Sequence, residues 1–319
     1  MTAPGERRAA VVVLVALAAA PLVLGTYGSA TLARLLAFAL LAASADLLVG
    51  TTGLPTLGHS AHFGAGAYAA GWVARNVTAS APVLLAAAAG VSAVIAVIAG
   101  SVAVRARGVF FLMLTLAIGE VVQQLAQSWH DVTGGSDGLY GIPATRLAGF
   151  ALSDAAAFCW YALAVFIAGM AVLRGVARAP LGAALRGIRD NEPRMRALGY
   201  PTYRYKLAAF VIAGSVAGIA GAVFAGQQRL VTPADLGFTA SAPVLLAVII
   251  GGEATAWGPC LGAAIVVGLR DVLGPSLGGH GDLVLGAVFV VVVFAMPGGL
   301  ARIAGRIAGP SGRAAGGPR

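Results

Sequence analysis

Two histidines and one glutamate lie within apolar runs of this sequence. They are its candidates for metal binding or for acid–base catalysis. His59 and His62 are three residues apart, which places both rings on one face of a helix. With Glu120 they contain the donor atoms of a zinc site, or the acid and base of an intramembrane enzyme. Two histidines and one distant acid are weak support for either, and hydrogen bonding between helices explains them more simply. We therefore predict no metal, no cofactor and no catalytic residue.

Two acids lie inside apolar segments, where ionisable groups are costly. Glu120 is about three turns into its segment, where it either lines a lumen or locks helices together by accepting a hydrogen bond. The lock is the favoured interpretation. Asp46 is near one end of its segment, and we expect it to pair with Arg105 or Arg107.

These residues belong to a chain that is mostly apolar. Of its 319 residues, 59% are hydrophobic and 10% are charged, and the mean hydropathy is +0.89. Soluble domains contain about 25% charged residues, so the composition indicates an all-α polytopic membrane protein. The net charge of +9 comes from basic residues in short loops and tails, which argues against nucleic-acid binding. Cys159 and Cys260 lie in or beside apolar runs and are interpreted as small buried hydrophobes.

Apolar runs separated by short polar stretches predict about ten transmembrane or half-membrane helices, several of them near the ~20 residues that cross a bilayer. Three are weaker and are candidate half-helices or re-entrant segments, namely 57–73, 240–252 and 282–297. The first run resembles a signal peptide, but an uncleaved span is favoured because more spans follow. The predicted spans are 9–26, 32–50, 57–73, 81–104, 108–128, 152–173, 205–226, 240–252, 257–273 and 282–297.

The distribution of basic residues predicts the orientation. With ten crossings and the N-terminus inside, sixteen of the 21 Lys and Arg residues face the cytoplasm. Both termini are then cytoplasmic. We expect residues 1–300 to form a single transmembrane domain and the Gly-, Pro- and Arg-rich segment 301–319 to be a disordered basic tail.

Residues 174–206 form a basic polar island, which predicts a cytoplasmic loop with a defined shape. Pro180 suits the first turn of one short helix, and Pro193 starts a second, with Gly199 as its C-cap. The first helix carries one apolar stripe, formed by Leu181, Leu185 and Ile188. Such a helix either lies on lipid headgroups or docks into a partner ATPase as a coupling helix. Physical reasoning alone favours neither.

An absence limits how the protein obtains energy. The sequence contains one lysine, Lys206, and no Gly-x-x-x-x-Gly-Lys-[Ser/Thr] segment. Such a segment cradles the phosphates of ATP. If transport is driven by ATP, another chain must therefore supply the ATPase.

Five ordered segments carry motifs that are specific when taken together. They are Gly58-His59-Ser60-Ala61-His62-Phe63-Gly64, Arg107-Gly108 through Glu120, Thr133-Gly134-Gly135-Ser136-Asp137-Gly138, Leu185 to Glu192, and Gly251-Gly252 with Trp257-Gly258-Pro259. In this the chain resembles the M-type permease subunits of high-affinity branched-chain amino acid ABC importers, from about residue 44 to 300. Two segments depart from the family pattern: Glu253–Thr255 replaces a Gly-Ser pair, and Leu54–Thr56 replaces Gln-Leu-Ser. Both departures could tune the substrate.

The resemblance implies one subunit of a larger assembly in a bacterial inner membrane. A sister permease chain would complete the pore, two P-loop ATPase chains would dock beneath it, and an extracytoplasmic binding protein would deliver the amino acid. The loop 174–206 would carry the coupling helix. Its coupling residues would be Leu185, Arg186, Ile188, Arg189, Asp190, Asn191, Glu192 and Gly199.

A zwitterionic substrate needs donors for its carboxylate, which the N-termini of broken helices can supply. The broken segments near Gly58 and Gly251 make the translocation-path candidates Gly58, His59, Ser60, Glu120, Gly251 and Gly252. The matching outer-loop motif comprises Thr133, Gly134, Gly135, Ser136, Asp137 and Gly138.

Two rival functions stay open. Related permeases with the same architecture carry urea or short-chain amides. A stand-alone ion-coupled secondary transporter would need an ion or proton site within the membrane, and the sequence offers few acids there.

Overall fold

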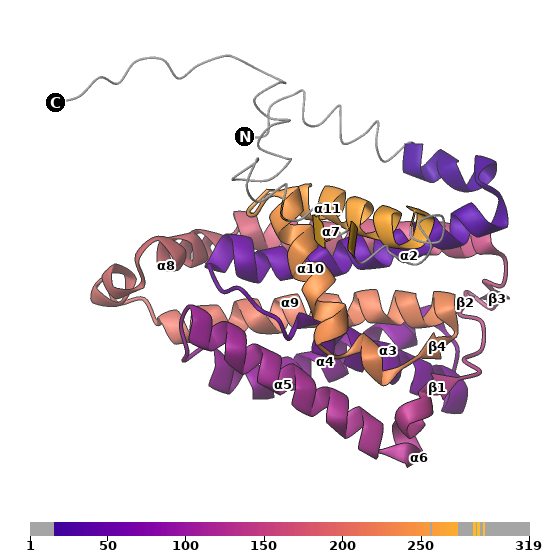
Figure 1. The fold of residues 1–319 in the computed structure, drawn as a ribbon, viewed down its shortest axis with the longest axis horizontal. Helices are drawn as coiled ribbons and strands as arrows, with labels where there is room; N and C mark the ends of the chain where they lie inside the picture. Colours follow the sequence, from indigo (N-terminus) through magenta and orange to yellow (C-terminus); the bar gives the residue numbers. More distant parts are fainter. Residues whose placement is uncertain (1–15, 256, 274–282, 285, 288–289, 291–319) are drawn as a thin grey trace.

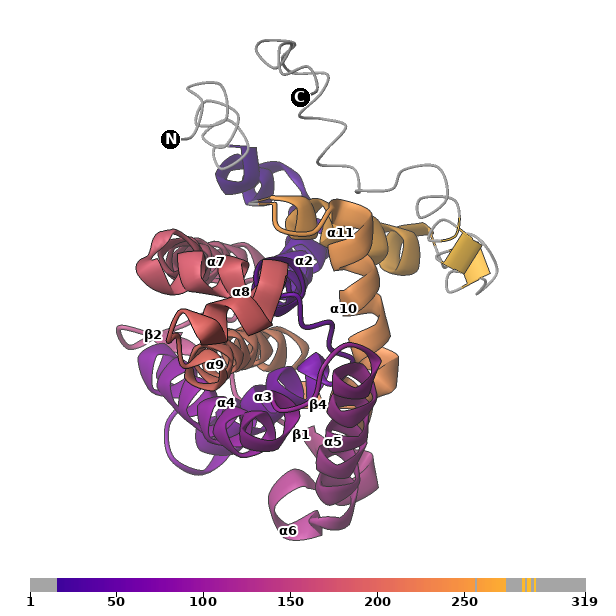
Figure 2. The same cartoon turned by 90° about the vertical axis from the view of Figure 1, so that its left-hand side faces the viewer.

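The computed structural model describes residues 16–255 and 257–273, together with 283–284, 286–287 and 290. Most of these residues are helical, and the helices pack in one bundle (Figures 1 and 2). The predicted last span, 282–297, lies largely outside the described residues. The predicted tail, 301–319, lies wholly outside them.

The helices of the bundle differ widely in length. Residues 16–23 are helical and precede the first labelled helix. The π-helical segment η1 continues directly from α2. The helical elements are α2 (Gly25–Asp46), η1 (Leu47–Thr52), α3 (His59–Asn76), α4 (Ala81–Ala103), α5 (Val109–Ser128), α6 (His130–Thr133), η2 (Gly135–Asp137), α7 (Ala155–Arg178), α8 (Pro180–Ala197), α9 (Thr202–Gln228), η3 (Pro233–Asp235), α10 (Phe238–Gly251), α11 (Gly258–Val267) and η4 (Gly268–Leu273).

Within the described residues, six helical segments are long and apolar enough to cross a membrane. They make the chain an all-α polytopic membrane protein, as its composition predicts. Two further predicted spans correspond to α3 and α11, which have 18 and 10 residues and do not belong to this set. The six segments are Gly25–Thr52, Ala81–Ala103, Val109–Ser128, Ala155–Arg178, Thr202–Gln228 and Pro233–Gly251.

The boundary between the first two predicted spans is wrong. The prediction places a connection at 27–31, whereas α2 runs through these residues and the chain bends at Leu24. Gly25 has a φ of +64°, a left-handed conformation that glycine adopts readily. Gly28 is instead accommodated within the helix. The presence of small residues is therefore not enough to predict where the helix bends.

Helix α9 forms the centre of the bundle and packs against α3, α4 and α2 (Figure 2). Glycines make this close approach possible. A Cβ on Gly218 would stand 2.6 Å from the Cβ of Ser92, and a Cβ on Gly221 would stand 2.9 Å from the backbone nitrogen of Ala67. Backbones that approach this closely gain dispersion contacts, which drive helix association inside a membrane.

Four short strands gather at one end of the bundle, which we call the sheet end (Figure 1). Strand β1 (Leu139–Tyr140) pairs antiparallel with β4 (Leu230–Val231), with Leu139 opposite Val231. Strand β2 (Arg146–Leu147) pairs antiparallel with β3 (Phe150–Ala151). Helix α8 lies at the opposite end, which we call the α8 end.

Candidate functional site

The first turns of α3 and α10 meet inside the bundle, at a place we call the helix-start junction. The Ser60 hydroxyl lies 2.9 Å from the carbonyl oxygens of both Leu236 and Gly237. The Ser60 backbone N–H donates to the hydroxyl of Ser241 at 3.2 Å, and the two hydroxyls are also in contact. Both helices therefore begin among polar groups within the packed structure, as expected of broken membrane helices.

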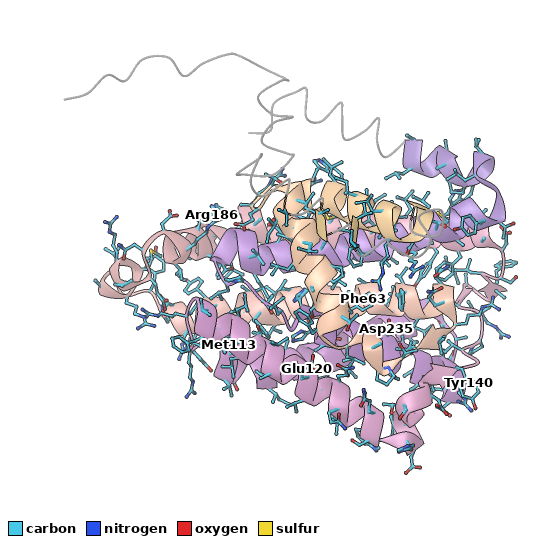
Figure 3. The ribbon with its side chains drawn as sticks, viewed as in Figure 1. Phe63, Met113, Glu120, Tyr140, Arg186 and Asp235 are labelled. Carbon is cyan, nitrogen blue, oxygen red and sulfur yellow. The ribbon has the colours of Figure 1, made fainter. Side chains whose placement is uncertain are left out.

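Glu120 reaches this junction from α5 (Figure 3). Its Oε1 accepts a hydrogen bond of 3.0 Å from the backbone N–H of Phe238, the first residue of α10. A carboxylate at this position satisfies an unpaired N–H and complements the positive end of the helix dipole. The predicted lock between helices is confirmed. The same side chain is exposed in the single chain, on the outer face of α5.

The two histidines have different surroundings. His59 Nε2 lies 2.8 Å from the hydroxyl of Ser44 on α2, so the predicted hydrogen bond between helices is confirmed for His59. His62 packs edge-on against Phe210 of α9, with ring centroids 5.2 Å apart. Both imidazoles are buried. In the part of the chain that the structure describes, no group of three or more His, Cys, Asp and Glu side chains gathers to hold a metal ion.

The predicted path candidates fall into two groups. Gly58 joins the helix-start junction, because it packs on the backbone of Thr115 in α5, where a Cβ would stand 2.8 Å from the carbonyl carbon. Gly251 and Gly252 instead end α10, about 20 Å further along the helix. A Cβ on Gly251 would stand 3.0 Å from the backbone nitrogen of Pro259, so this glycine lets α10 and α11 turn closely around each other.

Helix α8 is two short helices, as the two prolines predict. Pro180 occupies the first turn, and the backbone of Asn191 is non-helical, with φ −159° and ψ 92°. The Asn191 side chain then accepts a hydrogen bond of 2.9 Å from the N–H of Arg194 and caps the second helix, a cap the sequence analysis missed. Gly199, with φ +86°, follows its end. Leu185 and Ile188 of the apolar stripe are buried against the bundle.

Glu192 is the centre of an ionic cluster that ties α8 to its neighbours. Its carboxylate lies 2.7 Å from Arg196, 3.2 Å from Arg107 before α5, and 3.2 Å from Lys206 in α9. The Lys206 side chain is only 3% exposed. Burial raises the pKa of the Glu192 carboxyl, but Lys206, Arg107 and Arg196 together hold it below its ordinary value.

The predicted partner of Asp46 is wrong. Arg107 pairs with Glu192, and the guanidinium of Arg105 lies 5.8 Å from the ring centre of Tyr203. Asp46 instead accepts a hydrogen bond of 2.9 Å from the backbone N–H of Ala254, in the turn between α10 and α11. The error has a simple cause: that turn is far away in the sequence and brings a backbone donor to the end of α2.

Arg189 connects α8 to η1 and to the turn between α10 and α11 at once. One guanidinium nitrogen donates to the carbonyl oxygen of Gly50 in η1, and the other lies 3.7 Å from the carboxylate of Glu253. Asp46 also lies at this contact, because its carboxylate accepts a hydrogen bond from the backbone N–H of Ala254 in the same turn. We call this contact between α8, η1 and the α10–α11 turn the Arg189 junction. Glu253 belongs to a segment that departs from the family pattern, and its pairing with Arg189 was not predicted.

The other predicted coupling residues lie on the outer side of α8. Arg186 donates to the carbonyl oxygen of Ala177 at 2.7 Å and so ties α8 to the end of α7. Arg186 and Asp190 are both exposed, and Figure 3 marks Arg186 at the α8 end. The exposed side chains leave this face of α8 available for a partner.

The outer-loop motif is a series of tight turns at the sheet end. Gly134, Gly135 and Gly138 have φ values of +77°, +64° and +78°, which explains the need for glycine. The Thr133 hydroxyl donates to the carbonyl oxygen of Trp129 at 2.7 Å. Ser136 and Asp137 remain exposed at the surface. The motif thus gives the loop a fixed shape beside β1.

Fold and site together define a class: a multi-pass helical membrane protein with broken helices inside the bundle and an ordered polar helix at one end. The family described as "Branched-chain amino acid transport system / permease component" matches residues 28–293, and the chain belongs to this family. It is a membrane permease subunit by that membership, and the resemblance predicted from its motifs is confirmed.

Two relatives carry the same printed name, "High-affinity branched-chain amino acid transport system permease protein LivM". The protein from Escherichia coli (strain K12) is 29% identical over 309 residues, which cover 86% of this chain and 70% of that protein. The protein from Salmonella typhimurium (strain LT2) is 30% identical over 278 residues, covering 80% of this chain and 65% of that protein. No solved structure matches the chain.

Proposed function

We propose that this chain is the membrane-spanning permease subunit of an ATP-binding-cassette importer that carries branched-chain amino acids into the cell. The observation that carries the proposal is membership of the permease family across residues 28–293. The sequence has no P-loop of its own. The energy therefore comes from separate ATPase chains.

The proposed assembly has three kinds of partner. A sister permease completes the pore, two P-loop ATPase subunits bind at the α8 end, and an extracytoplasmic binding protein delivers substrate at the sheet end. The strongly basic loop 174–206 supports a cytoplasmic α8 end, because basic loops stay on that side. In this proposal the chain has about ten transmembrane or half-membrane helices in the bacterial inner membrane, with both termini in the cytoplasm.

The translocation path runs along the exposed face of α5. Met113 and Val121 on that face are 59% and 67% exposed and would suit lipid. Glu120 and Gln124 share the face and are also exposed. Polar and ionisable groups in a membrane face protein or water rather than lipid. Their presence supports a path between this face and the sister chain, with the helix-start junction behind it (Figure 2).

The Arg189 junction transmits the movement of the ATPases. When ATP closes the ATPase pair, α8 moves with the surface it docks on. Arg189 joins α8 to η1 and to the α10–α11 turn, so both follow α8. Helix α10 begins at the helix-start junction, and its displacement changes access to the path. This is a rigid-body transition between two packed states.

Purification of the tagged chain from its own cell in mild detergent tests the proposal. We expect a second permease and one or two P-loop ATPases to co-purify, and any recovered binding protein to bind leucine rather than urea. Binding of urea or a short amide would move the chain to another cargo within the same architecture. Recovery of the chain alone, still active in vesicles without ATP, would overturn the proposal in favour of a secondary transporter.

A further inference from the structure

A cavity of about 110 Å³ lies between α2, α3, α9, η3, α10, α11 and η4, away from the exposed face of α5. An ordered water needs about 10–15 Å³ measured in this way. The cavity is therefore several times larger than one ordered water requires, which leaves room for a small organic molecule.

Four charges line this cavity: Arg34 of α2, Asp235 of η3, and Arg270 and Asp271 of η4. Two are cationic and two are anionic; Arg270 is exposed and the Arg34 side chain is 40% exposed, whereas Asp235 and Asp271 are half-buried. Ionisable groups on membrane helices are costly, and those that face a cavity mark candidate substrate sites. A ligand with one positive and one negative group would match both kinds of charge.

The rest of the lining is apolar and partly aromatic. Phe63 and Phe224 pack at the wall as a tilted pair with ring centroids 5.2 Å apart, and Phe38 and Leu41 belong to the same surface. Figure 3 shows Phe63 and Asp235 close together between the layers of the bundle. Pockets for small molecules combine such apolar walls with a few fixed polar groups.

Asp235 and Arg34 are held in place by their protein partners, and each can still form further hydrogen bonds to a ligand. Asp235 Oδ2 accepts both the backbone N–H and the hydroxyl of Thr232, at 2.8 and 3.0 Å. A carboxylate can accept about four hydrogen bonds, so an ammonium group can still bind it. Arg34 Nη1 lies 3.2 Å from Asp271. A guanidinium has five N–H donors, so Arg34 can also bind a carboxylate of the ligand.

We propose that this cavity binds the cargo, an α-amino acid with a short aliphatic side chain, through Arg34 and Asp235. The inference rests on the proposed function for the identity of the cargo. The cavity adjoins the helix-start junction, because Asp235 precedes α10 and Ala240 of α10 lines the cavity. An amino acid held here is next to the first turn of α10, the element that moves with α8.

The test compares two substitutions on α10, with the whole complex in nanodiscs and no binding protein. Ala240→Leu fills the cavity without changing its charges. Ala242→Leu, two residues away and equally half-buried, adds the same atoms outside the lining. Equilibrium binding of radiolabelled leucine should fall about tenfold or more for Ala240→Leu and stay within about twofold for Ala242→Leu. Equal binding by both variants would overturn the proposal.

A ligand series on the unsubstituted complex gives a second test that does not depend on folding of a variant. 4-Methylpentanoate lacks the ammonium group of leucine, and 3-methylbutylamine lacks its carboxylate. Each should compete with leucine at least about tenfold more weakly, since a charge-assisted hydrogen bond is lost. Equal competition by either compound would overturn the proposal. ATP-driven uptake by the same complex is read separately, so loss of this site and loss of the proposed function are distinguishable.

Discussion

At the scale of single residues, Glu192 has the most demanding surroundings at the α8 end. It contacts three cations, and one of them, Lys206, is almost fully buried. Its own side chain is 12% exposed. Removing the carboxylate would leave Lys206 charged and unpaired, which costs more than the pair itself contributes.

We therefore expect Glu192→Gln to destabilise the protein by about 2 kcal/mol, less than the about 3–5 kcal/mol for a fully buried pair because Glu192 is partly exposed. Thermal unfolding in detergent measures this. Asp190→Asn, two residues away on the exposed side, is the matched control and should change stability by less than about 0.5 kcal/mol. Equal effects of both substitutions would contradict the central role of Glu192.

The same group makes stability depend on pH. The pKa of the Glu192 carboxyl is lowered in the folded protein. Its stabilising contribution is therefore complete above the unfolded value of about 4.3 and is lost as the pH falls through the lower folded value. Unfolding temperatures should lose this contribution only below about pH 4, and the loss should be smaller in Glu192→Gln.

Two substitutions of Glu120 can separate its role as a helix cap from its role as a charge in the proposed path. Glu120→Ala removes the acceptor of the Phe238 N–H and should cost about 1 kcal/mol of stability, the usual effect of losing a cap. Glu120→Gln keeps a carbonyl oxygen as acceptor and should restore most of that stability. Thermal unfolding and leucine uptake are measured for both. Stability as low in Glu120→Gln as in Glu120→Ala would contradict the capping role.

At the scale of elements, α8 combines two contacts with different purposes. Leu185 and Ile188 bury its apolar stripe against the bundle, so the helix cannot lie freely on lipid headgroups. Arg189 then connects it to η1 and to the α10–α11 turn. An anchored helix with an exposed polar face fits a coupling helix better than a membrane-surface helix.

Arg189→Gln should weaken the coupling of ATP hydrolysis to transport more than it weakens assembly of the complex. The reconstituted complex should hydrolyse ATP, but the amount of leucine carried per ATP should fall about fivefold or more, within the usual range of coupling energies. Arg204→Gln removes the same charge from an exposed site at the start of α9 and is the control. A ratio of transport to hydrolysis that is unchanged in Arg189→Gln would show that this junction does not transmit the movement.

Local signals predicted individual elements well, and contacts between distant segments poorly. Pro180, Pro193 and Gly199 act on neighbouring backbone, so the shape of α8 could be predicted from them. The partner of Asp46 and the pairing of Arg189 with Glu253 depend on how α10 and α11 return to the end of α2. Periodicity and composition contain no information on that return.

In the proposed assembly, the whole molecule supplies one half of a pore and a sister permease supplies the other. The four-charge cavity lies inside this chain, whereas the polar face of α5 is open and needs a partner. We therefore predict that cargo binding is a property of this chain and that translocation needs the assembly. The number of membrane crossings could be predicted only approximately, because α3 and α11 are too short or too polar to be judged by hydropathy.

Leucine uptake tests most directly whether this chain belongs to an ATP-driven importer. The complex is purified through this chain and reconstituted into vesicles with its binding protein. We predict uptake that requires ATP on the α8 side and continues when a proton ionophore collapses the ion gradients. Uptake that proceeds without ATP and stops with the ionophore would contradict an ATP-driven importer and identify an ion-coupled carrier.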